Sequence, residues 1–528
     1  MRPSPRTTNL LLILAGVIIM GLAGRQNSQL VSLRAEHNLV EEIDPLVGAS
    51  PWVRFIQVGL GGFRGILVDI LWTRATRLQD DHQYFELTQL ADWISKLEPR
   101  VPEVWAFHAW NQAYNISVLF NTPHERWQWV RNGITLLRDE GLRYNPNSPK
   151  LHWELGWMYQ HKMGADLDTM HGMYKLYWAN EMATLFPSNA PPYAVWTSYP
   201  DTAEELAENT AISSLINTLE NAGYAPTEDP FLDEFLGRPV FPKNVIEAFE
   251  ADPVALQKLL TFLRKQRLQK VYKLELSTMK EVDDKYGPFD WRLPQAHSTY
   301  WAYRGMKRTD EKQGLRLHRM IYQSMASSFR YGSFTIIDEH LPPDFSPNLA
   351  ILDNTMMAYE EALEEYKNVA VEQAHSNLLV DAIMILSEYG QRTRAQEIYE
   401  DYTALYPAPK KLDYESFVLQ TMFSEGFDAL GQDEATHIVE GKLREAYVYL
   451  AAGLPDRAEG FFYWAKRVYD KFSTRANDEA QRLKWTRTWN DFRAQARQDA
   501  LRVFRNPEKL DILEQEKIVP TESPPELD

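Results

Sequence analysis

Apolar residues recur at helical spacing along most of this chain, and proline or glycine separates the apolar segments. The spacing predicts helices over 52–78, 84–99, 102–117, 124–144, 203–222, 253–286, 294–306, 313–329, 348–370, 375–389, 414–430 and 438–453, with a capping helix to about 503. No segment shows the alternation of apolar and polar residues that is typical of a strand. The sequence therefore predicts an essentially all-α fold.

Two segments share one spacing of turn, small and aromatic residues. They are Gly390, Ala395, Tyr399, Tyr402 and Pro407 in the first, and Gly453, Ala458, Phe462 and Ala465 in the second. The pattern resembles the tetratricopeptide repeat (TPR), a helix-turn-helix unit of about 34 residues that buries its apolar face only by stacking on neighbours. The resemblance implies TPR-like helical hairpins stacked into a superhelical solenoid, and a role in protein binding.

Composition and repeat matches divide the chain into six parts. We predict an N-terminal transmembrane anchor or signal peptide (1–24), a tether (25–50), an N-terminal TPR-like block (51–187), a helical insert (188–293), a C-terminal TPR-like block (294–505) and a disordered acidic tail (506–528). The insert includes a helix with six cationic residues between 258 and 273, which could face anionic lipid or an acidic partner. A solvated face is the favoured interpretation, because mixed charges follow.

The first residues predict a membrane segment. Residues 7–24 carry no charge, and Arg2 and Arg6 precede them. The favoured interpretation is a single-pass anchor in the inner (cytoplasmic) membrane through residues 8–24, with a cytoplasmic N-terminus and a periplasmic or otherwise extracytoplasmic body. A cleaved signal peptide is the alternative, with Gly21 and Ala23 as small residues before the cleavage point. In both cases the rest of the chain is exported.

Composition excludes several classes of site. A net charge of −17 argues against nucleic acid as the main ligand, because phosphate binding needs surplus Lys and Arg. The absence of cysteine excludes disulfides, thiolate metal sites and a cysteine nucleophile. His152, His161 and His171 are nine and ten residues apart, whereas ligands on one helix are three or four apart. We therefore predict no metal or other cofactor.

One polar cluster is a candidate for catalysis. Asp290, Arg292 and His297 are close in sequence, and a carboxylate that orients an imidazole makes a general base. No nucleophile lies at a recognisable spacing, and Asp–Arg pairs commonly hold loops in place, so a structural role is favoured. This run, the glycines between 59 and 65, and the region of Trp105 also resemble uncharacterised bacterial membrane-anchored TPR proteins. That resemblance implies no activity.

Tryptophan is concentrated in the N-terminal block. Seven of the 16 tryptophans are Trp105, Trp110, Trp127, Trp129, Trp153, Trp157 and Trp178. Trp153 and Trp157 are one helical turn apart and should share a face. Most are expected in the core, and one or two should line a groove that grips a peptide or stacks on a sugar. The candidate partner-binding groove comprises Trp105, Trp110, Tyr159 and Trp301.

These features predict a non-enzymatic scaffold of the bacterial cell envelope. The stacked hairpins would bind a protein or peptide partner and assemble a membrane or export complex. The alternative is a cell-envelope saccharide-binding protein or hydrolase that uses the tryptophan-rich half and the run from Asp290 to His297.

Overall fold

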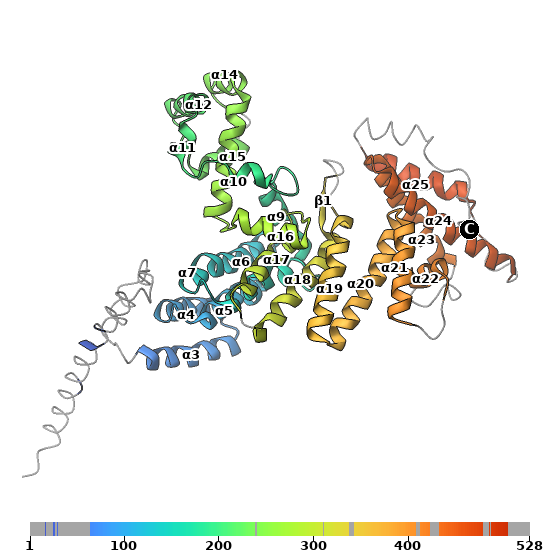
Figure 1. Cartoon of the computed structure of the whole chain (residues 1–528), viewed down its shortest axis with the longest axis horizontal. Coiled ribbons are helices and arrows are strands. Elements are labelled where there is room, and N and C mark those ends of the chain that lie inside the picture. The colour runs from blue at the N-terminus through green and yellow to red at the C-terminus, as the bar shows by residue number, and fades with distance from the viewer. Residues whose placement is uncertain are drawn as a thin grey trace, which may run out of the picture. The chain divides into compact units, whose positions relative to one another are not determined.

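The structure, a computed structural model, describes residues 16, 25, 26, 29, 64–237, 240–309, 311–336, 343–407, 412–422, 432–478, 485 and 487–504 (Figure 1). Unit 1 comprises the described residues up to Val282 together with His297–Ile321, and unit 2 comprises Asp283–Ala296 and the described residues from Tyr322 onward. Helices dominate both units, which confirms the all-α prediction. The predicted anchor, tether and acidic tail lie outside the described residues, apart from isolated positions near the N-terminus.

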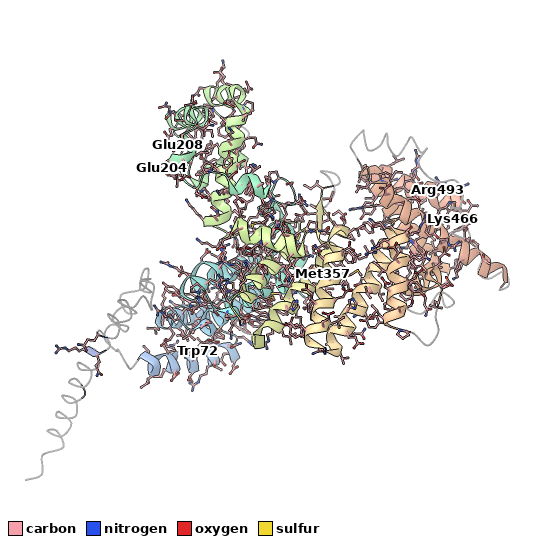
Figure 2. The ribbon with its side chains drawn as sticks, viewed as in Figure 1. Trp72, Glu204, Glu208, Met357, Lys466 and Arg493 are labelled. Carbon is pink, nitrogen blue, oxygen red and sulfur yellow. The ribbon has the colours of Figure 1, made fainter. Side chains whose placement is uncertain are left out.

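Unit 1 begins with three helices that share one core. They are α3 (Arg64–Asp80), α4 (Tyr84–Leu97) and α5 (Pro102–Trp110). Helix α4 buries Leu87, Leu90 and Ile94, which repeat at helical spacing and pack with apolar side chains of its two neighbours. Trp72 of α3, labelled in Figure 2, meets the ring of Phe107 of α5 edge-on at 4.9 Å. The predicted helix over 84–99 is therefore confirmed.

Three helices of unit 1 continue into π-helical turns. Helix α5 runs into η2 (Asn111–Ile116) and the short η3 (Ser117–Leu119); α6 (Pro123–Thr135) runs into η4 (Leu136–Gly141) and α7 (Leu142–Tyr144); α8 (Pro149–Trp157) runs into η5 (Met158–Met163). Helices α6 and α8 start at a proline whose preceding Thr122 or Ser148 accepts a backbone N–H bond. Helix α9 (His171–Ala183) follows.

The insert consists of shorter helices than we predicted. They are α10 (Tyr193–Thr197), α11 (Ala203–Ala207), α12 (Thr210–Asn221), α13 (Asp229–Gly237), α14 (Lys243–Ala251), α15 (Pro253–Lys270) and α16 (Leu276–Tyr286). The predicted single helices over 203–222 and 253–286 were wrong. Asn209 accepts two backbone N–H bonds and so starts a new helix, and Lys273 has a left-handed φ of 56° between α15 and α16.

The predicted solvated face of α15 was also wrong at two cations. Lys265 and Arg267 are buried. Lys265 lies 2.8 Å from the Asp201 carboxylate, and Arg267 bonds Asp229 at 2.7 Å and Asp233 at 2.6 Å. These pairs tie α15 to the preceding part of the insert.

Unit 2 is built mainly of paired helices. Helices α17 (Pro294–Met306) and α18 (Glu311–Tyr331) belong partly to each unit; then come η6 (Leu349–Ile351), α19 (Leu352–Tyr366), α20 (Val369–Glu388), α21 (Arg392–Leu405), α22 (Tyr414–Met422), α23 (Gln432–Ala451), α24 (Pro455–Asp478) and α25 (Trp489–Val503). The sequence did not predict the small antiparallel sheet of β1 (Ser333–Thr335) and β2 (Asp344–Ser346), in which Phe334 pairs with Phe345.

The two segments with shared spacing each form a helical hairpin. Gly390 turns α20 into α21 with a φ of 79°, and Gly453 turns α23 into α24 with a φ of 76°. In each hairpin the residue after the glycine donates its backbone N–H to a carbonyl five residues earlier, which is a Schellman turn. Ala395 and Ala458 are buried where the helices touch. The pattern therefore predicted both turns correctly.

Helix α20 is the one described helix that is long and apolar enough to cross a membrane. It buries eight residues in unit 2, among them Leu378, Leu379 and Ile383. A core helix has these properties as well.

Candidate functional site

The residues of the predicted groove occupy different environments in unit 1. Trp105 is buried and donates its indole N–H to the Pro99 carbonyl at 2.7 Å. Tyr159 and Trp301 are buried as well. Trp110 alone among the four groove candidates is well exposed, at 41%. Of the predicted groove, Trp110 is therefore the residue with the most exposed ring.

Trp110 begins a row of five aromatic rings on the surface of unit 1, which we term the aromatic ladder. Its ring stacks on Tyr114 at 4.8 Å, and Tyr114 lies 5.9 Å from His161. His161 stacks on Trp157 at 4.4 Å, and Trp157 stacks on Trp153 at 5.2 Å. All rings after Trp110 are partly exposed. The ladder thus crosses from α5 and η2 to α8 and η5.

Spacing of four residues builds the ladder on each helix. Trp110 and Tyr114 are four apart, and so are Trp153, Trp157 and His161. Residues four apart lie one above the other on a helix surface, which explains the stacking. Sequence reasoning placed Trp153 and Trp157 on one face but assigned that face to the core. The same spacing, applied to Tyr114 and His161, would have extended the pair to the whole ladder.

A buried ion pair supports the centre of the ladder. Lys162, next to His161, lies with its ammonium 5.1 Å from the centre of the Tyr114 ring. The same ammonium bonds the carboxylate of Asp168 at 2.6 Å, and Arg126 lies 3.4 Å from that carboxylate. Both Lys162 and the Asp168 side chain are almost fully buried. These buried contacts of Lys162 therefore hold the backbone next to His161 in place.

The ladder is electrically neutral near pH 7. Burial lowers the pKa of His161, and the positive charge of Lys162 lowers it further. Burial likewise raises the pKa of the Tyr114 hydroxyl, with Glu154 adding to the effect. The Tyr114 hydroxyl lies 3.3 Å from Nδ1 of His161. An uncharged aromatic surface of this kind suits apolar and aromatic side chains of another protein.

The polar cluster predicted around residue 290 divides into two separate environments. The Asp290 carboxylate, which is buried, accepts bonds from Nε and Nη2 of Arg292 at 2.8 and 2.6 Å. It also accepts the backbone N–H of Phe334 at 3.2 Å, while Arg292 donates to the Phe334 carbonyl at 2.9 Å. Asp290 and Arg292 thereby hold the loop before α17 to β1 within unit 2.

His297 belongs to unit 1 and is buried among aromatic rings. It stacks on Tyr159 at 5.2 Å and meets Trp178 edge-on at 4.9 Å. The side chain is 1% exposed, so it presents no surface to a substrate. Asp290 and Arg292 thus bond each other and the backbone of β1, whereas His297 packs among aromatic rings.

Two of the three histidines considered as metal ligands have contacts of their own, whereas Nδ1 of His171 is buried without a hydrogen-bond partner among the described residues. Nδ1 of His152 bonds the Ser148 carbonyl at 2.8 Å, and His161 belongs to the ladder. Burial lowers the pKa of His171. Among the described residues no group of three or more His, Asp and Glu side chains is arranged to hold a metal ion.

Comparisons with protein-family models, with curated proteins and with solved structures find no match to this chain. The function is therefore inferred from the chemistry and geometry of the sites themselves. The aromatic ladder is the candidate site, because it places five rings that are at least partly exposed in one continuous row.

Proposed function

We propose that this protein is a non-enzymatic, membrane-tethered helical-repeat scaffold of a bacterial cell envelope, and that the aromatic ladder holds a partner protein. The ladder is the observation that carries the proposal. Tryptophan and tyrosine are the residues most enriched at energetic hot spots of protein interfaces, and a row of them is costly to leave in water. The predicted anchor at residues 8–24 would hold the protein in the membrane, and the partner would be a membrane or export complex.

Stacking within the ladder favours a protein partner over a saccharide. A sugar binds aromatic residues through a free ring face. In the ladder, neighbouring rings occupy each other's faces, with interplanar angles of 15–16° at three of the four contacts. The outer ring, Trp153, has the guanidinium of Arg316 5.8 Å from its centre. All five rings remain at least partly exposed, and ring edges suit side chains that pack beside them.

Site-specific photo-crosslinking tests the proposal in the full-length protein in its native membrane. The crosslinker p-benzoylphenylalanine is placed at Trp110 and, as a matched control, at Trp93 of α4, which is also 41% exposed. We expect a discrete protein adduct from position 110 and none from position 93. Trp157→Ala should weaken that adduct strongly, because truncating a central aromatic costs about 2 kcal/mol or more, roughly 30-fold in affinity.

Two outcomes contradict the proposal. One is equal adducts from positions 110 and 93. The other is an adduct that Trp157→Ala leaves unchanged while circular dichroism shows a native fold. Binding of soluble wall glycans to the wild type, lost in Trp157→Ala, would instead support the saccharide-binding alternative. Sequencing of the mature amino terminus separates an anchor from a cleaved signal peptide.

A further inference from the structure

A cavity in unit 1 has an unusual charge for this acidic protein. It is a half-open cavity of about 370 Å³ between η4 and α7 on one side and the α15–α16 connection and the end of α17 on the other. Five cationic side chains line it: Arg138, Arg143, Lys273, Arg304 and Arg308. The chain as a whole carries a net charge of −17, so this concentration of positive charge is local.

Carboxylates neutralise two of these cations. Arg138 makes a two-pronged bond to Asp139 at 2.7 and 2.8 Å, and Arg304 lies 3.1 Å from Glu275. These two acids also line the cavity. The other three cations, Arg143, Lys273 and Arg308, have no carboxylate partner among the described residues.

Two buried donors of the cavity wall lack an acceptor. The indole N–H of Trp301 and the Nε–H of Arg308 are both buried without a hydrogen-bond partner in the described part of the chain. Trp301 itself is 1% exposed. Buried donors are almost always satisfied in folded proteins, and both residues line the cavity. An acceptor bound in the cavity could reach either donor after a small movement of the wall.

Histidine does not contribute to the positive charge. His152 lines the cavity, and burial lowers its pKa to about 4. The bond to the Ser148 carbonyl opposes this shift, whereas the nearby guanidinium groups of Arg308 and Arg304 add to it. Burial and the charge of Arg304 also lower the pKa of Arg308, while the nearby Glu275 carboxylate and Tyr300 oppose this shift without cancelling it. The like charges therefore repel one another, and an anion between them would relieve that repulsion.

We propose that this cavity binds the phosphomonoester group of a small molecule or of a lipid headgroup. A phosphomonoester offers nearly two negative charges and three strong acceptor oxygens, which matches three unneutralised cations and two unpaired donors better than a single carboxylate does. The volume lies within the range of small-molecule pockets, about 300 to 1,000 Å³, so the ligand carries an organic body beyond the phosphate. Leu142, Pro146 and Leu274 line the cavity and would contact that body.

Calorimetric titration of the full-length protein in detergent micelles tests this site. The probe is glycerol 3-phosphate, and glycerol is the uncharged comparison. We expect saturable binding of the phosphate ester alone. Arg308→Gln should weaken it at least tenfold, because one charged donor is lost. Lys307→Gln is the matched control: it removes the same charge at the next residue, which pairs with Glu281 outside the cavity, and should leave binding unchanged.

A second variant guards against misfolding. The side chain of Arg308 makes one hydrogen bond to described residues, to the Arg304 carbonyl at 2.8 Å, and Arg143→Gln acts on the opposite wall. Both variants should weaken binding.

Vesicles of phosphatidylcholine with and without phosphatidate identify the source of the phosphate. Binding of phosphatidate that depends on Arg308 indicates a lipid headgroup, whereas binding of glycerol 3-phosphate alone indicates a soluble ligand. Either supports the site.

Three results overturn the proposal. The first is the absence of saturable binding of both glycerol 3-phosphate and phosphatidate vesicles. The second is equal affinity in Arg308→Gln and Lys307→Gln. The third is tighter binding of succinate than of glycerol 3-phosphate, which would replace the phosphoryl group by a carboxylate. The aromatic ladder is not involved in any of these measurements, so they are independent of the proposed scaffold function.

Discussion

Alanine at Gly390 and at Gly453 should have very different costs, although the two glycines occupy the same position in their hairpins. Both have φ values near +80°, so alanine is strained by about 1–2 kcal/mol at either position. A β-carbon at Gly453 would meet nothing within 4 Å. A β-carbon at Gly390 would lie 2.6 Å from the backbone oxygen of Asp456 in α24.

The added cost at Gly390 comes from contact between neighbouring hairpins. Backbone atoms in a packed helix move little, and overpacking typically costs about 1–3 kcal/mol. Gly390→Ala should therefore cost about 2–5 kcal/mol and Gly453→Ala about 1–2 kcal/mol. Gly460→Ala tests the other side of the contact without φ strain: its β-carbon would overlap the Glu388 carbonyl oxygen and lie 2.5 Å from the Gly390 nitrogen. At Gly441, within α23, an added β-carbon would meet nothing within 4 Å, so Gly441→Ala should stabilise by about 0.5–1 kcal/mol.

Hydrogen exchange of the full-length protein measures these differences locally. Amides of α24 should exchange about tenfold faster for each 1.4 kcal/mol lost. We expect the strongest protection from exchange in Gly441→Ala, followed by the wild type, Gly453→Ala and finally Gly390→Ala. Gly460→Ala should also be less protected than the wild type. Equal protection in Gly390→Ala and Gly453→Ala would refute the stacking contact, and so would a neutral Gly460→Ala.

Two further perturbations test buried groups of unit 1. Burial lowers the pKa of His108 and His152 to about 4, whereas an unfolded histidine titrates near 6.5. The unfolded state therefore binds protons first, and stability should be full above pH 6.5 and fall by about 3 kcal/mol per histidine towards pH 4. Melting temperatures of the double variant His108→Gln/His152→Gln should vary less over this range; an unchanged pH dependence contradicts the assignment. The double variant Asp229→Asn/Asp233→Asn leaves the buried Arg267 guanidinium without its carboxylates and should lower the free energy of unfolding by about 3–5 kcal/mol. Arg267→Met instead leaves two carboxylates that water reaches, and should lower it by about 1–2 kcal/mol. Urea unfolding followed by circular dichroism measures both, and equal costs would contradict this asymmetry.

The parts of the fold that were predicted correctly depend on local sequence patterns. A turn glycine and a small residue five positions later are enough to define the hairpins at Gly390 and Gly453, because both act within a few turns of helix. The strands β1 and β2 were missed because each has three residues, too few to show alternation. The break at Lys273 was missed because a left-handed lysine has no sequence signature.

Tertiary contacts decided what the sequence did not predict. Trp105 and Trp110 lie five residues apart on one predicted helix, and only packing shows that the first is core and the second surface. Arg267 looked solvated because its partners, Asp229 and Asp233, lie 38 and 34 residues earlier. The cavity draws its cations from three separate parts of the chain, so no local pattern marks it.

The π turns make the ladder depend on residue count as well as on residue type. Tyr114 lies in η2 and His161 in η5, and each of these segments widens its helix by one residue per turn relative to a regular helix. An α-helix turns about 100° per residue, so deleting one residue between Trp110 and Tyr114 would turn the second ring by about that angle relative to the first. Residues three apart still share a helix face, so these two rings would stay neighbours, but Tyr114 would shift relative to His161 on the other helix. A one-residue change of length would therefore alter the contact between the two halves of the ladder while leaving every aromatic side chain in the protein.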